Sequence, residues 1–328
     1  MVMLVRNREL NDALRSMRFV EDRFNRKFRY PWTFLNDEPF TQEFINYTTG
    51  MASGKVQYGL INKDQWSVPD HIDLHKVKKN MEKMVSKNVI YAGSMSYRHM
   101  CRYNSGFFYR HELLKNYDWY WRVEPGVEFF CDVDYDPFTY MRTHGKVYGF
   151  VMSMYEYLAT IETLWDSTKE FVRQNPQYLA ADNALDFFVD GKSPSKQGDT
   201  EIDGNYNLCH FWSNFEIASL NFWRSPAYSD YFNFLDAQGG FFYERWGDAP
   251  IHSLAAGLFL PKDKIHHFGD IGYRHLPYSR CPQDEKSHVS GRCYCSRQDH
   301  FDDDGYSCLP RWWKVAGQSE GAGPRPAE

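Results

Sequence analysis

Short apolar runs alternate with segments of helical periodicity through the first half of the chain. The apolar runs predict β-strands at Met3–Arg6, Trp32–Leu35, Val56–Ile61, Trp119–Val123 and Val147–Met152. Apolar residues spaced three and four apart predict helices at Asp12–Phe24, Thr41–Tyr47, Leu74–Lys87, Arg98–Leu114 and Thr160–Arg173. Strands that alternate with helices favour an α/β fold with a mainly parallel central sheet flanked by helices.

A sheet of this kind binds ligands in the crevice beyond the carboxyl ends of its strands. Neither a Gly-x-Gly-x-x-Gly segment nor a Walker loop follows the first predicted strand. The sequence therefore disfavours the dinucleotide-binding and P-loop classes. It also contains no internal repeat and no heptad pattern, which favours a single domain.

The second half of the chain is more irregular. The polar stretch Asp190–Asn205 predicts a surface loop, and an aromatic block follows from Phe211 to Trp246. We divide the chain into a catalytic domain over 1–280 and a Cys-rich extension over 281–328 that packs on it. The extension is expected to be loop-rich, and its last residues, Gln318–Glu328, are expected to be frayed.

Four cysteines lie in the extension: Cys281, Cys293, Cys295 and Cys308. Their Cys-x-Cys pair does not match the spacing of a zinc site, which usually presents two Cys-x-x-Cys knuckles. A segment with little regular structure is better held by disulfides in an oxidising compartment. We therefore predict that at least two of these four cysteines form disulfides.

The composition gives little reason to expect a nucleic acid or a membrane surface as the partner. The net charge of −5 gives no case for nucleic acid or an anionic membrane surface. Aromatic residues make up 18% of the chain; most belong to the core, although flat rings also suit the C–H faces of sugars. No stretch approaches the ~18 apolar residues of a membrane-spanning helix. Because the chain opens directly on its first predicted strand, we expect any targeting segment to be missing.

Two acidic segments are candidates for a metal site. Glu124 and Pro125 end an aromatic strand, so Glu124 lies at the strand's carboxyl end or is simply a surface acid at a turn. Just downstream, Asp132 and Asp134 have the spacing of an Asp-x-Asp metal motif. The alternative for this second segment is that the acids cap a helix beginning at Asp136–Pro137.

Two further carboxylates stand in aromatic surroundings. Glu216 lies in a strand-like aromatic run, where an unpaired buried charge is costly, so it is paired, poised for chemistry, or on the polar side of an edge strand. Asp248 precedes an apolar helix and could simply be its N-cap. Nearby Arg245 could neutralise a phosphate or pair with a carboxylate.

Three histidines occur close together, at His266, His267 and His275. Adjacent residues on a strand point to opposite faces, so His266 and His267 cannot easily share a metal. His275 follows a Gly-rich turn and is the freer candidate ligand, although a structural role suits any one of the three taken alone.

Several long blocks of the sequence now point to one family. They are SMRFVEDRFNRKFRYPWTFLNDEPFT, SYRHMCRYNSGFFYRH, DWYWRVEPG, NLCHFWSNFEIASLNFWRSPAYSDYF and GGFFYERWGDAPIHS. Together they closely resemble the fungal Golgi α-1,2-mannosyltransferases of glycosyltransferase family 15. The resemblance implies a GT-A-like fold and Mn²⁺-dependent transfer of mannose from GDP-mannose, with retention of configuration. It also implies a location in the Golgi lumen, with a single-pass anchor and stem upstream that this chain lacks.

The resemblance also implies roles for individual residues. Glu124 matches the family's substitute for an Asp-x-Asp metal motif, and His275 matches its metal-binding histidine. Tyr97 matches a nucleotide-site tyrosine. Glu216 matches the proposed nucleophile, and Asp248 matches an active-site acid near the acceptor.

The diphosphate contacts, the full set of metal ligands and the exact role of Glu216 stay open. Arg6 and Arg102 are weaker candidates for contacts with the diphosphate. Gly126 stands where a second metal-binding carboxylate could follow the Glu-Pro pair, so that ligand is not supplied. Glu216 would face C1 of mannose, either forming a covalent adduct or stabilising a front-face substitution.

The acceptor implied by the resemblance is a mannosylated O-linked or N-linked glycan. Two other functions compete with the transferase. A retaining α-mannosidase would need two carboxylates ~5 Å apart, which Glu216 and Asp248 could supply. A catalytically silent mannose-binding module would keep the aromatic cleft without turnover.

Overall fold

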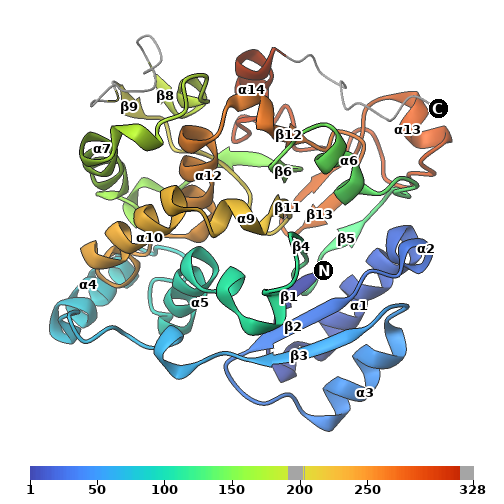
Figure 1. Ribbon diagram of the computed structural model, residues 1–328, viewed down its shortest axis with the longest axis horizontal. Coiled ribbons are helices and arrows are strands. Elements are labelled where there is room, and N and C mark those ends of the chain that lie inside the picture. The colour runs from blue at the N-terminus through green and yellow to red at the C-terminus, as the bar shows by residue number, and fades with distance from the viewer. Residues whose placement is uncertain (191–201, 203, 318–328) are drawn as a thin grey trace.

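The fold is built around a seven-stranded sheet, in the order β12-β6-β11-β4-β1-β2-β3 (Figure 1). The computed structural model describes residues 1–190, 202 and 204–317. The strands of this sheet are β1 (Val2–Leu4), β2 (Trp32–Asn36), β3 (Val56–Leu60), β4 (Trp119–Arg122), β6 (Tyr148–Phe150), β11 (Glu216–Ser219) and β12 (Ile265–His267). Four of its pairings are parallel, and only β11 runs antiparallel to its neighbours β4 and β6. The prediction of a mainly parallel α/β sheet is confirmed.

Helices flank this sheet on both faces (Figure 1). Those of the first half are α1 (Leu10–Val20), α2 (Arg26–Phe28), α3 (Gln42–Met51), α4 (Leu74–Ser86), α5 (Met95–Gly106) and α6 (Pro137–Thr143). Those of the second half are α7 (Leu164–Gln174), α8 (Leu185–Phe188), α9 (Leu220–Trp223), α10 (Pro226–Gln238), α11 (Gly240–Tyr243), α12 (Asp248–Phe259), α13 (Glu285–Val289) and α14 (Leu309–Ala316). Two apolar clusters, one on each side of the sheet, form the core.

Three small sheets complete the fold. β5 (Glu128–Phe129), β13 (Tyr273–His275) and β14 (Tyr278–Arg280) form one, β7 (Ser153–Tyr155) and β10 (Cys209–Phe211) the second, and β8 (Val189–Asp190) and β9 (Asn205–Tyr206) the third. Most of the predicted loop Asp190–Asn205 and the segment Gln318–Glu328 lie outside the described residues.

The predicted helix Arg98–Leu114 is wrong at both ends. α5 begins earlier because the Ser94 hydroxyl caps it, accepting a hydrogen bond from the Tyr97 amide at 3.1 Å. It ends at Gly106, where the ring of Phe232 packs so closely that a Cβ would lie 1.9 Å from it. The chain continues in 3-10 turns through Leu114.

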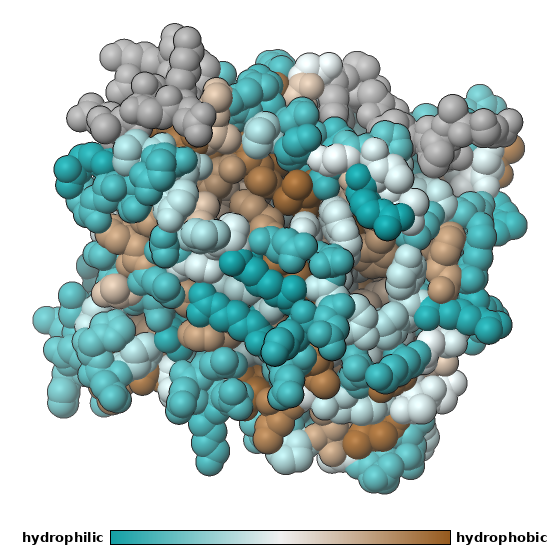
Figure 2. All heavy atoms as spheres, viewed as in Figure 1, coloured by the Kyte–Doolittle hydropathy of each residue, from teal (hydrophilic) through white to brown (hydrophobic). Residues whose placement is uncertain are grey.

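Helix α4 carries a run of exposed lysines. Lys76, Lys78, Lys79 and Lys83 are exposed, whereas Val77 and Met84 on the other side of the helix are buried. Figure 2 shows a largely hydrophilic surface in this region, interrupted by small apolar patches. The basic run is therefore the solvated face of an amphipathic helix, as its spacing predicts. No helix within the described ranges is both long and apolar enough to cross a membrane.

The C-terminal extension is tied to the rest of the chain by covalent bonds. Disulfides join Cys131 to Cys293 and Cys209 to Cys308, while a third joins Cys281 to Cys295. All four cysteines of the extension are paired, so the prediction of disulfides is confirmed. Trp312 of α14 is fully buried and packs edge-on against Phe150, Phe187 and Phe211. The division at residue 280 itself stays a prediction.

Candidate active site

A cavity of about 640 Å³ opens at the carboxyl ends of β1, β2 and β4. Its lining includes Arg6 beyond β1, Asp37 beyond β2 and Glu124 beyond β4. The cavity continues past these strand ends toward α12 and the β13–β14 hairpin. This is the position at which an open α/β sheet binds its ligands.

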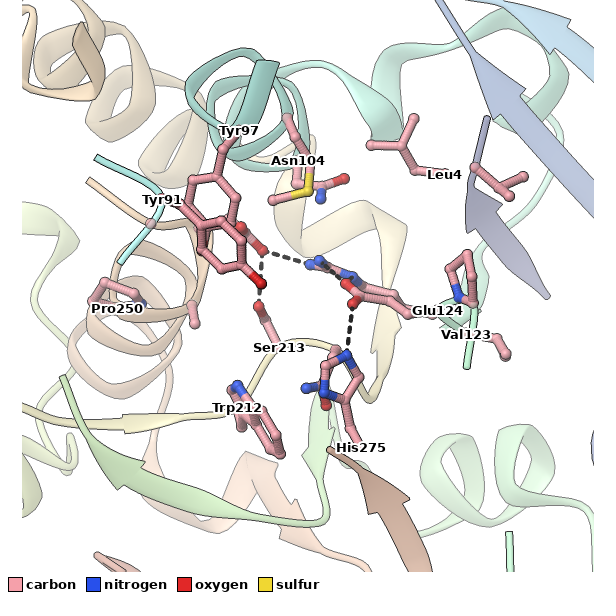
Figure 3. Close-up of a pocket in the computed structure, with 18 of the residues that line it drawn as sticks. Leu4, Tyr91, Tyr97, Asn104, Val123, Glu124, Trp212, Ser213, Pro250 and His275 are labelled. Atoms are coloured by element: carbon pink, nitrogen blue, oxygen red, sulfur yellow. Dashed lines mark hydrogen bonds and ion pairs between the residues drawn. The ribbon is translucent and has the colours of Figure 1, made fainter. Parts of the chain in front are cut away.

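An arginine holds the acidic groups of the cavity in place. Arg122, the last residue of β4, donates from Nε to Glu124 at 3.1 Å and from Nη1 to Asp248 at 2.5 Å. Ser213 also donates to Asp248, at 2.8 Å. Figure 3 shows these interactions as one connected chain from Ser213 to His275. Burial works to lower the pKa of Arg122, but Asp248 and Glu124 outweigh it and raise that pKa.

Glu124 and His275 point toward each other and are in contact at the cavity wall, as Figure 3 shows. Glu124 Oε2 lies 3.5 Å from His275 Nε2. Burial acts to raise the pKa of Glu124, but Arg122 and the hydrogen bond from His275 outweigh it and lower the pKa to about 2. Burial acts to lower the pKa of His275, and Glu124 reverses this and raises it. The pair thus brings together a permanent carboxylate and an imidazole nitrogen.

The chemistry of this pair fits a divalent transition metal. A carboxylate oxygen and an imidazole nitrogen are both accepted by Mn²⁺, whereas Mg²⁺ prefers an all-oxygen shell. Within the part of the chain that the structure describes, no three His, Cys, Asp or Glu side chains converge on a metal-sized position. The remaining ligands would therefore have to come from water or from a bound substrate.

The Asp-x-Asp segment is used structurally. Asp132 pairs with Arg23 at 2.6 Å and with Arg292, far from the cavity lining. Asp136 caps α6, accepting hydrogen bonds from the amides of Phe138 and Thr139. The capping alternative considered for this segment is therefore the one that the structure supports.

Tyr97, which matches a nucleotide-site tyrosine, and Arg6, a weaker candidate for a diphosphate contact, both line the cavity; their roles stay predictions. Tyr97 stacks on Tyr91 with ring centroids 4.6 Å apart, and Figure 3 shows the two rings side by side. Burial raises the pKa of the Tyr97 hydroxyl, which therefore stays protonated. Arg6 donates a hydrogen bond to Ser96, which lies next to Tyr97 at the start of α5.

Arg102 is not among the residues that line the cavity, so the structure does not support its suggested contact with the diphosphate. Its guanidinium binds Asp236 of α10 through two parallel hydrogen bonds of 2.7 and 2.8 Å. Residues four apart share a face of a helix. The sequence spacing of Arg102 therefore aligns it with Arg98 rather than with cavity-lining Met100 and Asn104.

Removing this pair should change stability without changing nucleotide binding. We expect Arg102→Ala to lower the free energy of unfolding by about 3 kcal/mol or more, because it leaves the carboxylate of Asp236 without its partner. Asp236→Asn should destabilise in the same direction. Denaturant unfolding and GDP titration of both variants check this, and a selective loss of GDP affinity would return Arg102 to the binding site.

Glu216 lies one layer behind the cavity. It has no exposed surface, and its carboxylate is hydrogen-bonded by Tyr120 at 2.6 Å, Tyr148 at 3.0 Å and His252 at 2.8 Å. Of these neighbours, Tyr120 lines the cavity, whereas Glu216 does not. Tyr120 thus connects Glu216 to the cavity by a hydrogen bond, and the role of Glu216 as a nucleophile stays a prediction.

Asp248 does reach the cavity. It is the first residue of α12, with Gly247 at the N-cap, so the alternative in which Asp248 is the cap is wrong. The carboxylate instead accepts from Arg122 and Ser213. Arg245 pairs with Glu156 at 3.5 Å and lies 5.0 Å over the Tyr97 ring, so it takes the carboxylate partner considered for it.

Three residues of the site were not identified from the sequence: Arg122, Trp212 and Tyr91. Arg122 and Glu124 are two apart at the end of a strand and so share a face, a spacing that could have revealed their contact. Trp212, whose ring lies 5.0 Å from that of His275, carried no signal beyond its aromatic block. Tyr91 adopts a positive φ of 57°, which is rare for an aromatic residue and cannot be inferred from the sequence.

Known proteins match this chain over nearly its whole length. The family model for glycolipid 2-alpha-mannosyltransferase matches residues 1–317. The chain is 56% identical to glycolipid 2-alpha-mannosyltransferase 2 of Candida albicans, covering 96% of this chain and 66% of that protein. It is 53% identical to glycolipid 2-alpha-mannosyltransferase of Saccharomyces cerevisiae, covering 96% of this chain and 69% of that protein. The chain thus spans about two thirds of the length of these relatives.

Two solved structures are closely similar. Core-mannan synthase A of Aspergillus fumigatus, in a Mn/GDP form, superposes with a TM-score of 0.88 at 42% identity, covering 97% of this chain and 85% of that one. The mannosyltransferase Ktr4p of S. cerevisiae in complex with GDP also gives 0.88, at 41% identity and with coverages of 98% and 82%.

The fold, the cavity beyond its parallel strands and these structural neighbours define a GT-A-like protein of the glycosyltransferase class. The chain belongs to the glycolipid 2-alpha-mannosyltransferase family, which its sequence blocks resemble.

Proposed function

We propose that this chain is a retaining α-1,2-mannosyltransferase that moves mannose from GDP-mannose to a mannosylated glycoprotein acceptor. The observation that carries the proposal is the convergence of Glu124 and His275 at the carboxyl ends of the parallel strands. The family membership supports it, as does the GDP named for two structures at about 40% identity.

The residues at the strand ends suit the nucleotide. The guanosine would lie over the carboxyl ends of β1 and β2, near Arg6 and Asp37, with the diphosphate turned toward Glu124 and His275. Mn²⁺ held by this pair would act as a Lewis acid on the diphosphate leaving group. Tyr97, on α5, forms the opposite wall and would contact the donor.

The remaining groups suit the sugar transfer. In the reaction, the bond from mannose C1 to the diphosphate breaks, and a bond forms from C1 to an acceptor hydroxyl, whose proton would pass to the departing diphosphate. Asp248 lies at the cavity wall, fixed by Arg122 and Ser213, where it could orient that hydroxyl. The complete burial of Glu216 favours front-face substitution over a covalent adduct in this conformation.

The acceptor would be an O-linked or N-linked glycan in the Golgi lumen, as in the family that the sequence resembles. Three disulfides are consistent with an oxidising compartment. Neither the mannosidase nor the silent binding module explains why a metal-binding pair stands at the nucleotide end of the cavity.

A donor panel tests the proposal. The chain is incubated with methyl α-mannoside, Mn²⁺ and each of GDP-mannose, UDP-glucose, UDP-galactose and UDP-N-acetylglucosamine. We expect transfer from GDP-mannose alone, with GDP released in equal amount. Release of free mannose from an α-mannoside without nucleotide would indicate the mannosidase instead, and no turnover with any donor would indicate the binding module.

A further inference from the structure

One end of the cavity is walled by tyrosines from distant parts of the chain. They are Tyr155, Tyr157, Tyr278 and Tyr306, here called the tyrosine wall. Tyr306 is at its centre, with ring centroids 6.1 Å from Tyr155, 6.0 Å from Tyr157 and 6.1 Å from Tyr278. Tyr157 is 52% exposed, so a large ring faces solvent at the mouth of the cavity.

The tyrosine wall extends away from the nucleotide end. His275 and Tyr278 are opposite each other in the β13–β14 hairpin. The ring of Trp212 contacts both, with centroids 5.0 Å from that of His275 and 5.7 Å from that of Tyr278. Figure 3 shows Leu4 of β1 and Trp212 on opposite sides of the Glu124–His275 pair. A donor held at the strand ends would leave the tyrosine wall free for another molecule.

Two charged groups line the same part of the cavity. Glu156, between Tyr155 and Tyr157, is 14% exposed in its side chain and accepts a hydrogen bond from Thr160 at 2.8 Å. Arg245 also lines the cavity, and its Nη2 lies 3.5 Å from Glu156 Oε1, a long contact. Charged groups of this kind form strong hydrogen bonds with the hydroxyls of a ligand. Together these groups offer an acceptor and a donor to the hydroxyls of a sugar.

The C-terminal extension fixes the tyrosine wall. The amide of Tyr155 donates to the carbonyl of Tyr306 at 3.3 Å, and Met154 and Ser307 form a β-bridge. Two residues beyond Tyr306, Cys308 is bonded to Cys209, which itself pairs with Tyr155 in the β7–β10 sheet. The extension therefore contributes a side chain to the cavity and is more than a stabilising tail.

We propose that the tyrosine wall, with Glu156 and Arg245, is an acceptor subsite for the mannose unit that precedes the one receiving the transferred sugar. The inference rests on the proposed function. Tyrosine rings pack against the C–H faces of a sugar while their hydroxyls reach its polar edge. A carboxylate and a guanidinium supply charge-assisted hydrogen bonds to its hydroxyl groups. The ligand is an α-linked dimannoside, and the subsite makes it a better acceptor than a single mannoside.

Steady-state kinetics with two acceptors test this subsite. The wild type should have a lower KM for methyl α-1,2-mannobioside than for methyl α-mannoside, with GDP-mannose saturating. Tyr157→Ala should raise the KM for the dimannoside about tenfold, which corresponds to about 1.4 kcal/mol. The KM for the monomannoside should change by less than about twofold, and the KM for GDP-mannose should not change.

Two variants separate ring contact from folding. Tyr306→Phe keeps the ring and should retain most of the dimannoside preference, whereas Tyr306→Ala should lose it with GDP affinity unchanged. Tyr47→Ala removes a similarly exposed tyrosine outside the cavity lining and should leave both KM values unaltered. A wild type without dimannoside preference, or a Tyr157→Ala variant that keeps it, overturns the subsite.

Failure of the proposed function is distinguishable from failure of the subsite. If the wild type transfers no mannose from GDP-mannose, the proposed function fails. The subsite is then judged by binding, with saturation-transfer NMR of methyl α-1,2-mannobioside on the same variants. Stronger binding to the wild type than to Tyr157→Ala supports the subsite, and equal binding contradicts it.

Discussion

Replacing Glu124 by alanine is expected to weaken Mn²⁺-dependent GDP binding by at least about a hundredfold, equivalent to about 2.7 kcal/mol. Glu124 is the carboxylate of the pair that faces the cavity, and Arg122 and His275 keep it ionised. Without it, His275 alone would have to hold the metal against the diphosphate. Calorimetric titration of GDP, with Mn²⁺, with Mg²⁺ and with a chelator, measures the effect.

Asp132→Ala is the matched control for Glu124→Ala. Asp132 belongs to the competing Asp-x-Asp segment but forms ion pairs with Arg23 and Arg292 away from the cavity. This variant should lose stability and keep its Mn²⁺-dependent GDP affinity. If Glu124→Ala instead binds GDP with unchanged Mn²⁺ dependence, the assignment of the metal site to Glu124 and His275 is wrong.

Replacing Glu216 by glutamine is expected to lower kcat by at least about a hundredfold, with little change in the KM for GDP-mannose. Tyr120, Tyr148 and His252 all direct polar groups at this carboxylate. A glutamine presents an amide NH₂ to some of these donors and removes the negative charge behind the cavity wall. Tyr120, which touches both Glu216 and the cavity, would transmit the change.

Glu21→Gln controls for the general cost of altering a buried carboxylate. Glu21 is 1% exposed and accepts hydrogen bonds from Trp32 and Asn25, but it lies outside the cavity lining. It should lose stability and keep kcat once folded. A Glu216→Gln variant within tenfold of the wild-type kcat, at equal GDP affinity, would remove Glu216 from the mechanism and direct attention to Asp248.

The parts of the fold set by local periodicity could be predicted from the sequence. Strand β2 begins where an apolar run begins, because all five of its residues are buried in the parallel sheet. Strand β3, at the edge of the sheet, is only partly buried, but its apolar run still marks it. The central position of β11 could not be predicted. It pairs antiparallel with β4 and β6, which are distant in the sequence, so only the tertiary fold determines its neighbours.

Some residues of the candidate site could likewise be predicted from local signals, whereas others depend on the tertiary fold. Turn and helix-start signals drew attention to Glu124 and Asp248, but only the family resemblance gave them active-site roles; the structure brings both onto one guanidinium. Arg102 lies on a different face of α5 from the cavity-lining Met100 and Asn104, a difference that helical spacing could have indicated. Tyr306 was missed because its place in the cavity depends on a disulfide between residues 99 positions apart.

The most direct test of the central claim is NMR analysis of the product formed from GDP-mannose, methyl α-mannoside and Mn²⁺. The account predicts one new mannose joined through O2 of the acceptor, with the same α anomeric configuration as the donor and no product when the metal is chelated. A β-linked product, a linkage to another hydroxyl, or full transfer in the presence of chelator would contradict it.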